Sequence, residues 1–229
     1  MRLLITFVGG LGHLAPLLPL ACAARDAGHE VAIAGSGGLV PRIEEAGFAA
    51  YATSAPAHHA APPASPARSP LEVMDAHAAE VELAANFADR GARRMAAAVP
   101  DVIEAFRPDL VLRDETDLGT TIAAELLGIP VACHLVLASG LLVRPGLVAP
   151  VLDAVRTDHG LPPDPDLDRL TTGLQLTQAP PSFRSPDAPL RLPREPLAYR
   201  TTVLPARCAS RDRPGGLRHP RHHLQRRVG

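Results

Sequence analysis

The first twenty residues, MRLLITFVGGLGHLAPLLPL, constrain the fold more than any other stretch of the chain. Residues 3–8 form an apolar run with β-branched and aromatic side chains, which predicts a buried strand. Three glycines interrupt the run, and apolar residues at helical spacing from Leu14 onward predict a helix. Pro16 suits the first turn of that helix, whereas Pro19 is expected to bend it. His13 therefore stands between a strand and a helix, at the position where open α/β sheets bind ligands.

The rest of the chain repeats this alternation. Further strands are predicted at 29–34, 48–52, 110–113, 130–136 and 174–177, and helices at 39–46, 118–127 and 146–157. Residues 71–106 have the spacing of one amphipathic helix, or of two that meet near Gly91. Residues 54–70 are rich in Pro, Ala and Ser and predict a long irregular loop. The β-α-β order favours an α/β fold, a Rossmann-like parallel sheet with helices on both faces.

Charge is distributed unevenly along the chain. Residues 1–189 contain 13 arginines and 22 acidic residues, whereas residues 190–229 contain ten arginines and only two acidic residues. A basic tail would suit nucleic acid or anionic lipid, but hydrophobic periodicity also ends near Pro180. We therefore expect an ordered domain at 1–189 and an unstructured tail at 190–229, with no nucleic-acid partner.

Several other classes of protein do not fit the sequence. Glycines, His13 and prolines interrupt the apolar N-terminus, so it reads as part of a domain rather than as a signal peptide. No stretch is long and apolar enough to cross a bilayer, so a cytoplasmic protein without a membrane partner is expected. Neither C-x-x-C nor H-E-x-x-H occurs, so no metal is expected. The glycines do not spell G-x-G-x-x-G, which argues against a dinucleotide cofactor and an oxidoreductase.

Four segments carry a resemblance to a known family. They read ITFVGGLGHLAPLLPLACAARDAGHEVAIAG, EEAGF, RPDLVLRDETDLGTTIAAELLGIP and LQLTQAPPSF. In this order they resemble the N-terminal half of bacterial glycosyltransferases of the GT-B fold, in the family that glycosylates macrolides, aromatic polyketides and similar natural products. The similarity runs from Met1 to about Ala188.

The resemblance implies the fold and the activity of a complete relative. An N-terminal domain holds the acceptor, a hydrophobic natural product, and a second domain binds the nucleotide sugar. The sugar, a hexose or deoxyhexose, is transferred with inversion to an acceptor hydroxyl, without a metal or another cofactor. The present chain would use a nucleotide sugar only if a donor domain were supplied.

The same resemblance assigns His13 as the catalytic base and Asp114 as the acid that orients it. The chemistry is coherent, because a histidine can accept the proton of an alcohol as the alcohol attacks, while a carboxylate fixes the ring tautomer. The first and fourth predicted strands end at one sheet edge, so the two residues can meet. Glu115 and Asp117 lie on the same loop as Asp114 and remain alternatives, although Asp117 also suits a helix cap.

Acceptor contacts are expected from residues near this edge and from two loops. The histidines among them could instead be solvated side chains, and the glycines could serve only a tight turn. The residues expected to contact the acceptor are Gly10, Leu11, Gly12, His58, His77 and Leu141.

The tail contains a second signal. Residues 216–226 read GLRHPRHHLQR. GC-rich codons for these residues, read one nucleotide later, encode VYVTLGTTFN, which resembles the strand with which relatives enter their second domain. The sequence therefore predicts that the tail is a frameshifted remnant of the donor domain and that the chain is inactive alone. The alternative is a non-catalytic remnant or partner protein that binds a small molecule.

Overall fold

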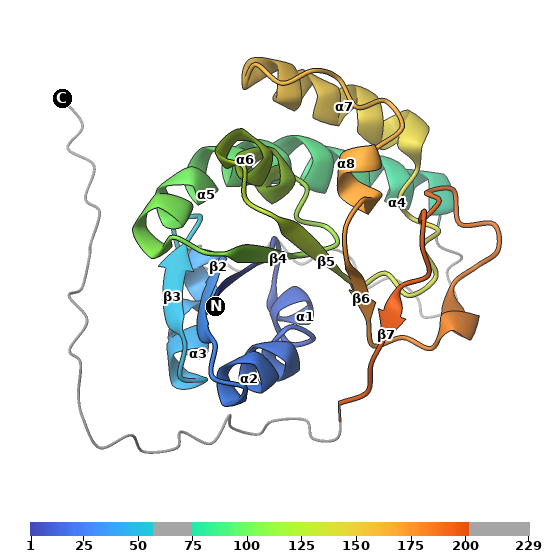
Figure 1. The fold of residues 1–229 in the computed structure, drawn as a ribbon. Helices are drawn as coiled ribbons and strands as arrows, with labels where there is room; N and C mark the ends of the chain where they lie inside the picture. The colour runs from blue at the N-terminus through green and yellow to red at the C-terminus, as the bar shows by residue number, and fades with distance from the viewer. Residues whose placement is uncertain (57–74, 202–229) are drawn as a thin grey trace, which may run out of the picture.

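The computed structural model describes residues 1–56 and 75–201 and contains a seven-stranded sheet (Figure 1). The strand order is β3-β2-β1-β4-β5-β6-β7, and every neighbouring pair is parallel. The strands are β1 Arg2–Thr6, β2 Glu30–Gly35, β3 Ala49–Ala52, β4 Leu110–Asp114, β5 Val131–Leu135, β6 Gln175–Thr177 and β7 Leu197–Ala198. The six strands predicted from the sequence are confirmed to within two residues, and so is the α/β fold.

Helices cover both faces of the sheet (Figure 1). One face carries α1 Leu11–Leu14, α2 Leu18–Asp26 and α3 Val40–Glu45. The other carries α4 Ala76–Leu83, α5 Ala92–Phe106, α6 Gly119–Leu127, α7 Pro145–Asp158 and α8 Asp168–Thr171. Two short 3₁₀ turns, η1 Gly37–Leu39 and η3 Pro181–Phe183, lie in connections.

The first helix differs from its prediction. It is divided into α1 and α2, with Pro16 between them and Pro19 in the first turn of α2. The expected roles of the two prolines are thus exchanged, because a proline in the first turn of a helix leaves no N–H unpaired. The break gives His13 a one-turn helix of its own at the edge of the sheet.

The helical stretch after residue 75 is continuous where the sequence allowed a break. Residues Ala84–Gly91 form a π-helical segment, η2, that joins α4 to α5. A π-helical turn has wider hydrogen-bonded loops than an α-helix, and such turns are frequent near functional sites. In this protein η2 carries Phe87, which reaches the site described below.

The alternation of side chains along β4 and β5 decides which residues reach the α1–α3 face. Leu112 and Ala132 pack with Leu14 and Leu17 in the hydrophobic core of that face. Because side chains alternate with a period of two, Asp114 and His134 lie on the same face two residues later. Both are buried, with exposed fractions of 0% and 1%.

The sheet continues beyond residue 189, where the sequence placed the end of the domain. Leu190 is buried, and β7 pairs with β6 through Leu197 opposite Leu176. Tyr199 N–H then donates to Thr177 O over 3.0 Å. A two-residue strand is too short to produce a hydrophobic period, so the pattern could not indicate it. Residues 202–229, most of the expected tail, and 57–70 of the expected loop lie outside the described residues.

Candidate active site

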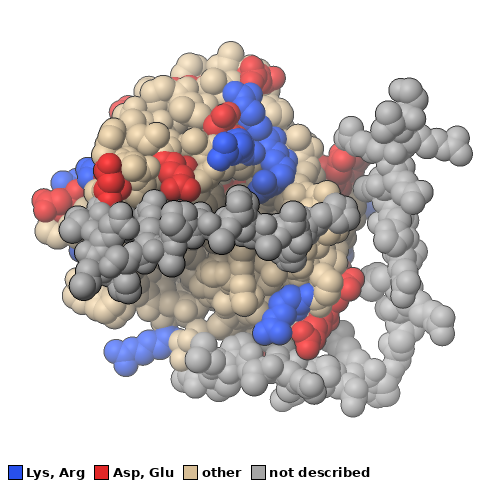
Figure 2. Space-filling model, turned by 180° about the vertical axis from the view of Figure 1, so that it is seen from behind, with Lys and Arg blue, Asp and Glu red and all other residues tan. Residues whose placement is uncertain are grey.

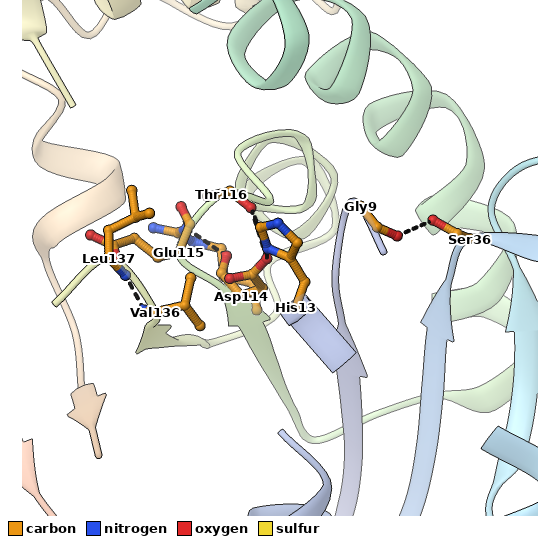
Figure 3. Close-up of polar contacts among 9 residues, drawn as sticks. Gly9, His13, Ser36, Asp114, Glu115, Thr116, Val136 and Leu137 are labelled. Carbon is orange, nitrogen blue, oxygen red and sulfur yellow. Dashed lines mark hydrogen bonds and ion pairs between the residues drawn. The ribbon is translucent and has the colours of Figure 1, made fainter. Parts of the chain in front are cut away.

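His13 and Asp114 meet at the carboxyl edge of the sheet, from α1 and the end of β4 (Figure 3). His13 Nδ1 lies 2.7 Å from Asp114 Oδ2. An ionised carboxylate has no proton to donate, so the ring donates through Nδ1–H and its Nε2 retains a lone pair. The His13 side chain is 24% exposed, and no described residue forms a hydrogen bond with Nε2. The pair therefore presents a basic nitrogen outside the sheet.

The turn before His13 requires glycine at position 9. Gly9 has a φ of +110°, and a Cβ there would lie 2.5 Å from Cδ2 of the His13 ring. The Ser36 hydroxyl donates to Gly9 O over 2.6 Å, which ties the turn to the end of β2 (Figure 3). The predicted tight turn is confirmed, and its first glycine is what lets the imidazole fold back over the backbone.

The surroundings of His13 act on its pKa in opposite directions. The hydrogen bond to Asp114 raises the pKa most strongly, the charge of Asp114 adds to it, and partial burial opposes both. Phe87 supplies part of that cover, with its ring centroid 5.6 Å from the imidazole. The net result is a pKa of His13 above its usual 6.5, which strengthens the ring as a proton acceptor.

Thr116 is a third member of the cluster that the sequence did not indicate. Its hydroxyl donates to Asp114 Oδ2 over 2.7 Å, and its oxygen lies 3.2 Å from His13 Nδ1. Asp114 Oδ1 is buried and has no hydrogen-bond partner among the described residues. A threonine two positions after the acid is the only sequence signal that could have suggested this contact.

The two alternative acids make other contacts. Glu115 accepts from the backbone N–H groups of Val136 and Leu137 over 2.9 and 2.8 Å (Figure 3). Asp117 accepts from Thr120 N–H over 3.2 Å and from the Thr120 hydroxyl over 2.7 Å, at the start of α6. Burial raises the pKa of both carboxyls. Of the three carboxylates on this loop, Asp114 is the one that touches His13.

Arg113 shapes the loop from the opposite face of the sheet. Its side chain is buried, and its guanidinium donates to Asp114 O, Glu115 O and Leu170 O over 3.1, 2.9 and 2.8 Å. No described carboxylate forms an ion pair with it. A buried cation held by three carbonyl oxygens fixes the backbone that carries Asp114, and no pattern in the sequence indicated this role of Arg113.

The residues expected to contact an acceptor are spread over the domain. Gly10, Leu11 and Gly12 adjoin His13, and Leu11 is half exposed. His77 lies on α4 with its ring exposed, 3.8 Å from a carboxylate oxygen of Glu80. Leu141 follows β5 and is partly exposed. His58 lies outside the described residues.

Two cavities lie near the carboxyl edge, and none of those residues lines either one. The larger, of about 340 Å³, opens beyond β5 and β6, with Leu137, Pro180, Arg184 and Ala188 among its walls. The smaller, of about 20 Å³, is lined by Phe87 and Thr116 of the His13 cluster. Both are lined by Leu135, Leu190 and Leu192, so they adjoin.

Residues 1–56 and 75–201 contain no cluster of three or more histidines, cysteines or acidic residues that could hold a metal ion. Within the same ranges no helix is long and apolar enough to cross a membrane. On the face in Figure 2, arginine and acidic side chains are interspersed rather than gathered into one basic surface.

Comparison with known proteins relates this arrangement to enzymes of Streptomyces. The chain is 31% identical over 167 residues to an L-demethylnoviosyl transferase of Streptomyces niveus, which spans 70% of this chain and 41% of the transferase. The solved glycosyltransferase SnogD of Streptomyces nogalater is 28% identical, with a TM-score of 0.58 over 82% of this chain and 50% of its own. Glycosyltransferase SsfS6 of Streptomyces sp. SF2575, complexed with thymidine diphosphate, is 26% identical, with a TM-score of 0.57 over 80% and 50%.

The chain thus spans about half the length of these relatives. Its sheet and helices are those of the N-terminal Rossmann-like domain of GT-B glycosyltransferases. Residues 22–200 match the family described as erythromycin biosynthesis protein CIII-like, N-terminal domain. The match includes β2 to β7, and with them Asp114 and Thr116 of the cluster. The chain belongs to this family of erythromycin biosynthesis protein CIII-like N-terminal domains.

Proposed function

We propose that this chain is the acceptor-binding half of a glycosyltransferase that acts on a hydroxyl group of a hydrophobic natural product. The observation that carries the proposal is the 2.7 Å contact between His13 Nδ1 and Asp114 Oδ2. It leaves Nε2 as the basic atom at the carboxyl edge of the sheet, where open α/β folds bind ligands.

In the proposed reaction, His13 Nε2 accepts the hydroxyl proton while the acceptor oxygen forms its bond to the anomeric carbon. The bond from that carbon to the nucleoside diphosphate breaks, and the diphosphate leaves with the electron pair. Attack from the face opposite the leaving group inverts the anomeric centre. Asp114 stabilises the imidazolium that forms and keeps the ring in its Nδ1–H tautomer.

The substrate classes come from the relatives and remain part of the proposal. One relative is named as a demethylnoviosyl transferase, and the SsfS6 structure holds thymidine diphosphate. A deoxythymidine-diphosphate sugar is therefore the donor we propose for the complete enzyme. For the acceptor we propose the cavity of about 340 Å³, since it has leucine and proline walls and adjoins the cavity that Thr116 and Phe87 line. Pockets for small ligands begin at about this size.

Gly10, Leu11, Gly12, His77 and Leu141 remain predicted acceptor contacts. Leu11 lies two residues before His13 and, unlike Gly10 and Gly12, has an apolar side chain, so it is the first to test. Leu11→Asp should weaken binding of hydrophobic acceptors by the 229-residue chain in calorimetric titrations, while Leu126→Asp, at a similarly exposed position on α6, should not. Equal weakening by both substitutions would remove Leu11 from the site.

The test of function joins this chain, through residue 201, to the C-terminal half of the L-demethylnoviosyl transferase. The fusion is incubated with thymidine-diphosphate sugars and a panel of polyketide and macrolide acceptors, and the products are identified by mass spectrometry. We expect a glycosylated acceptor with an inverted anomeric centre. A fusion that folds and binds donor and acceptor, yet transfers nothing, would refute the proposal.

We further propose that residues 202–229 are a frameshifted reading of the donor domain and that the 229-residue chain is inactive by itself. The support is the match of residues 216–226, read one nucleotide later, to VYVTLGTTFN. If the frameshift removes the diphosphate-binding domain, the sugar lacks the orientation that supplies a large part of the rate, which is the reason we expect the chain to be inactive. Sequencing the gene past codon 216 tests the frameshift, and sugar transfer by the purified chain alone would contradict the inactivity.

The alternative, a non-catalytic protein that binds a small molecule, predicts acceptor binding without transfer even in the fusion. A cytoplasmic location, with neither a membrane nor a nucleic acid as partner, is also our proposal. Fractionation of cells and a binding assay with duplex DNA would test these two points.

A further inference from the structure

A second histidine lies behind the catalytic pair. His134 on β5 and Asp114 on β4 are direct register partners in parallel strands. Neighbouring strands are about 4.8 Å apart, and paired residues face the same side of the sheet. Both side chains are buried, and each has one polar atom without a hydrogen-bond partner among the described residues, namely Asp114 Oδ1 and His134 Nδ1.

The tautomer of His134 follows from its other contacts. His134 Nε2 lies 2.8 Å from the Tyr199 hydroxyl, and Gln178 Nε2 donates to that hydroxyl over 2.8 Å. The Tyr199 hydroxyl has one proton to give, and the structure describes no other acceptor for it. It therefore donates to His134 Nε2, and the proton of the neutral ring lies on Nδ1.

We propose that His134 is a positioning residue for the catalytic pair, with its Nδ1–H linked to Asp114 Oδ1 through one water, and with Tyr199 setting the tautomer that allows this. A buried donor and a buried acceptor left alone each cost free energy, whereas facing one another they restrain the carboxylate. Burial lowers the pKa of His134 to about 4, so its ring is neutral near pH 7.

The arrangement connects the end of the domain to the catalytic helix. Tyr199 follows β7, and Gln178 Nε2 also donates to Pro16 O over 2.7 Å, three residues after His13. The groups that face Asp114 are thus His13 from α1, Thr116 from its own loop and His134 from β5. The catalytic meaning of this network rests on the proposed function, but the hydrogen bonds it requires do not.

The test uses the 229-residue chain labelled with ¹⁵N at histidine, with the ring signals assigned by His→Gln variants. In the parent we expect His134 in the Nδ1–H form at neutral pH. The ring of His159 forms no hydrogen bond with a described residue, so we expect a mixture of the two tautomers there. Tyr199→Phe should convert His134 to the Nε2–H form, because Nε2 loses its donor, and should shift the His13 Nδ1–H proton signal. The control is Tyr51→Phe, which removes the only other tyrosine hydroxyl in the chain and should change neither signal.

Two results overturn the proposal. The first is an Nε2–H tautomer of His134 in the parent, and the second is a His13 signal that stays unchanged when Tyr199→Phe alters His134. Neither measurement involves sugar transfer, so an inactive fusion protein would leave this inference standing, and a failed inference would leave the proposed function standing.

Discussion

The two histidines that flank Asp114 have opposite properties. His13 is partly exposed, pairs with a carboxylate and has a raised pKa. His134 is buried, pairs with the Tyr199 hydroxyl and has a pKa lowered to about 4. Asp114 raises the pKa of both rings. At His134 burial is the larger cause and outweighs the charge of Asp114.

In this arrangement Asp114 orients His13, the proposed proton acceptor, and is itself positioned by His134, the proposed hydrogen-bond donor. Access to solvent allows the His13 ring to carry a charge, and the contact with Asp114 stabilises that charge. Burial keeps the His134 ring neutral, so the ring donates and accepts hydrogen bonds without gaining a proton. A residue that must accept a proton during turnover belongs in the first environment, and one that only holds a geometry belongs in the second.

The largest effect is expected from replacing His13, the partly exposed histidine. In the fusion protein, His13→Ala should lower turnover by about 10²–10⁴-fold, the usual loss when a general base is removed. Acceptor binding should survive, because His13 does not line the cavity that we propose for the acceptor. The measurement is a steady-state transfer assay with calorimetric binding, and His159→Ala is the control. Turnover close to the parent's would refute the role of His13.

Asp114→Asn should reverse the electrostatics of His13. The substitution removes the charged hydrogen-bond acceptor that raises the pKa of His13, while the burial that lowers it remains, so the pKa of His13 should fall. NMR titration of the 229-residue chain measures this fall. In the fusion, turnover should drop less than for His13→Ala, with an altered pH–rate profile. If Glu115→Gln instead lowered the pKa and Asp114→Asn did not, the orienting acid would have been assigned to the wrong residue.

For His134, the buried histidine, we expect a loss of stability in acid. The pKa of His134 is about 4 in the folded chain, whereas an unperturbed histidine, as in the unfolded chain, has a pKa of 6.5. The folded state therefore favours the neutral ring. That contribution is complete above pH 6.5 and is lost as the pH falls toward 4. Between about pH 7.5 and pH 5 the free energy of unfolding should drop by about 2 kcal/mol from this residue.

Urea denaturation of the parent and of His134→Gln at both pH values tests this loss. The variant should lose less stability in acid than the parent does, by roughly the amount given above. His159→Gln is the control and should behave like the parent. An equal acid loss in the parent and in His134→Gln would mean that His134 is not held neutral by the fold.

The smallest effect is expected from Gln178, which links the surroundings of the two histidines. Gln178→Leu removes the donor to Pro16 O and to the Tyr199 hydroxyl, so the free energy of unfolding should fall by about 1 kcal/mol. The His13 ring signals should also broaden or shift, because the segment that follows α1 loses its hydrogen bond from Gln178, just after β6. Urea denaturation and the same NMR spectra provide the measurements. An unchanged stability together with unchanged ring signals would show that the two histidines are held independently.

The sheet and the position of His13, the proposed base, could be predicted from local pattern. Six strands show apolar runs with glycine or proline beside them, and the helices predicted between most of them favour parallel pairing. His13 follows the first of these strands directly, so its place at the carboxyl edge depends only on local chain direction. The sequence also placed an acid at the end of the fourth strand, although three carboxylates competed for the role.

Tertiary structure decided which of the three carboxylates pairs with His13. Asp114 alternates onto the α1 side of the sheet with Leu112, whereas Glu115 turns to the backbone after β5 and Asp117 to the start of α6. The choice depends on the register between β4 and its neighbours, which no local period contains. The same is true of β7, whose two residues are a strand only because β6 lies beside them.

By itself, then, the sequence determined the α/β order and the glycine turn, because each follows from contacts between close neighbours in the chain. It also placed His13 and three candidate acids at one sheet edge, and the family resemblance favoured Asp114 among them. Only the tertiary structure decided that His134 stands behind Asp114 and that Tyr199 holds it. These residues are 65 positions apart, and their meeting depends on the pairing of β5, β6 and β7. Such a contact arises from the packing of whole strands, and the residues that make it have no common pattern along the chain.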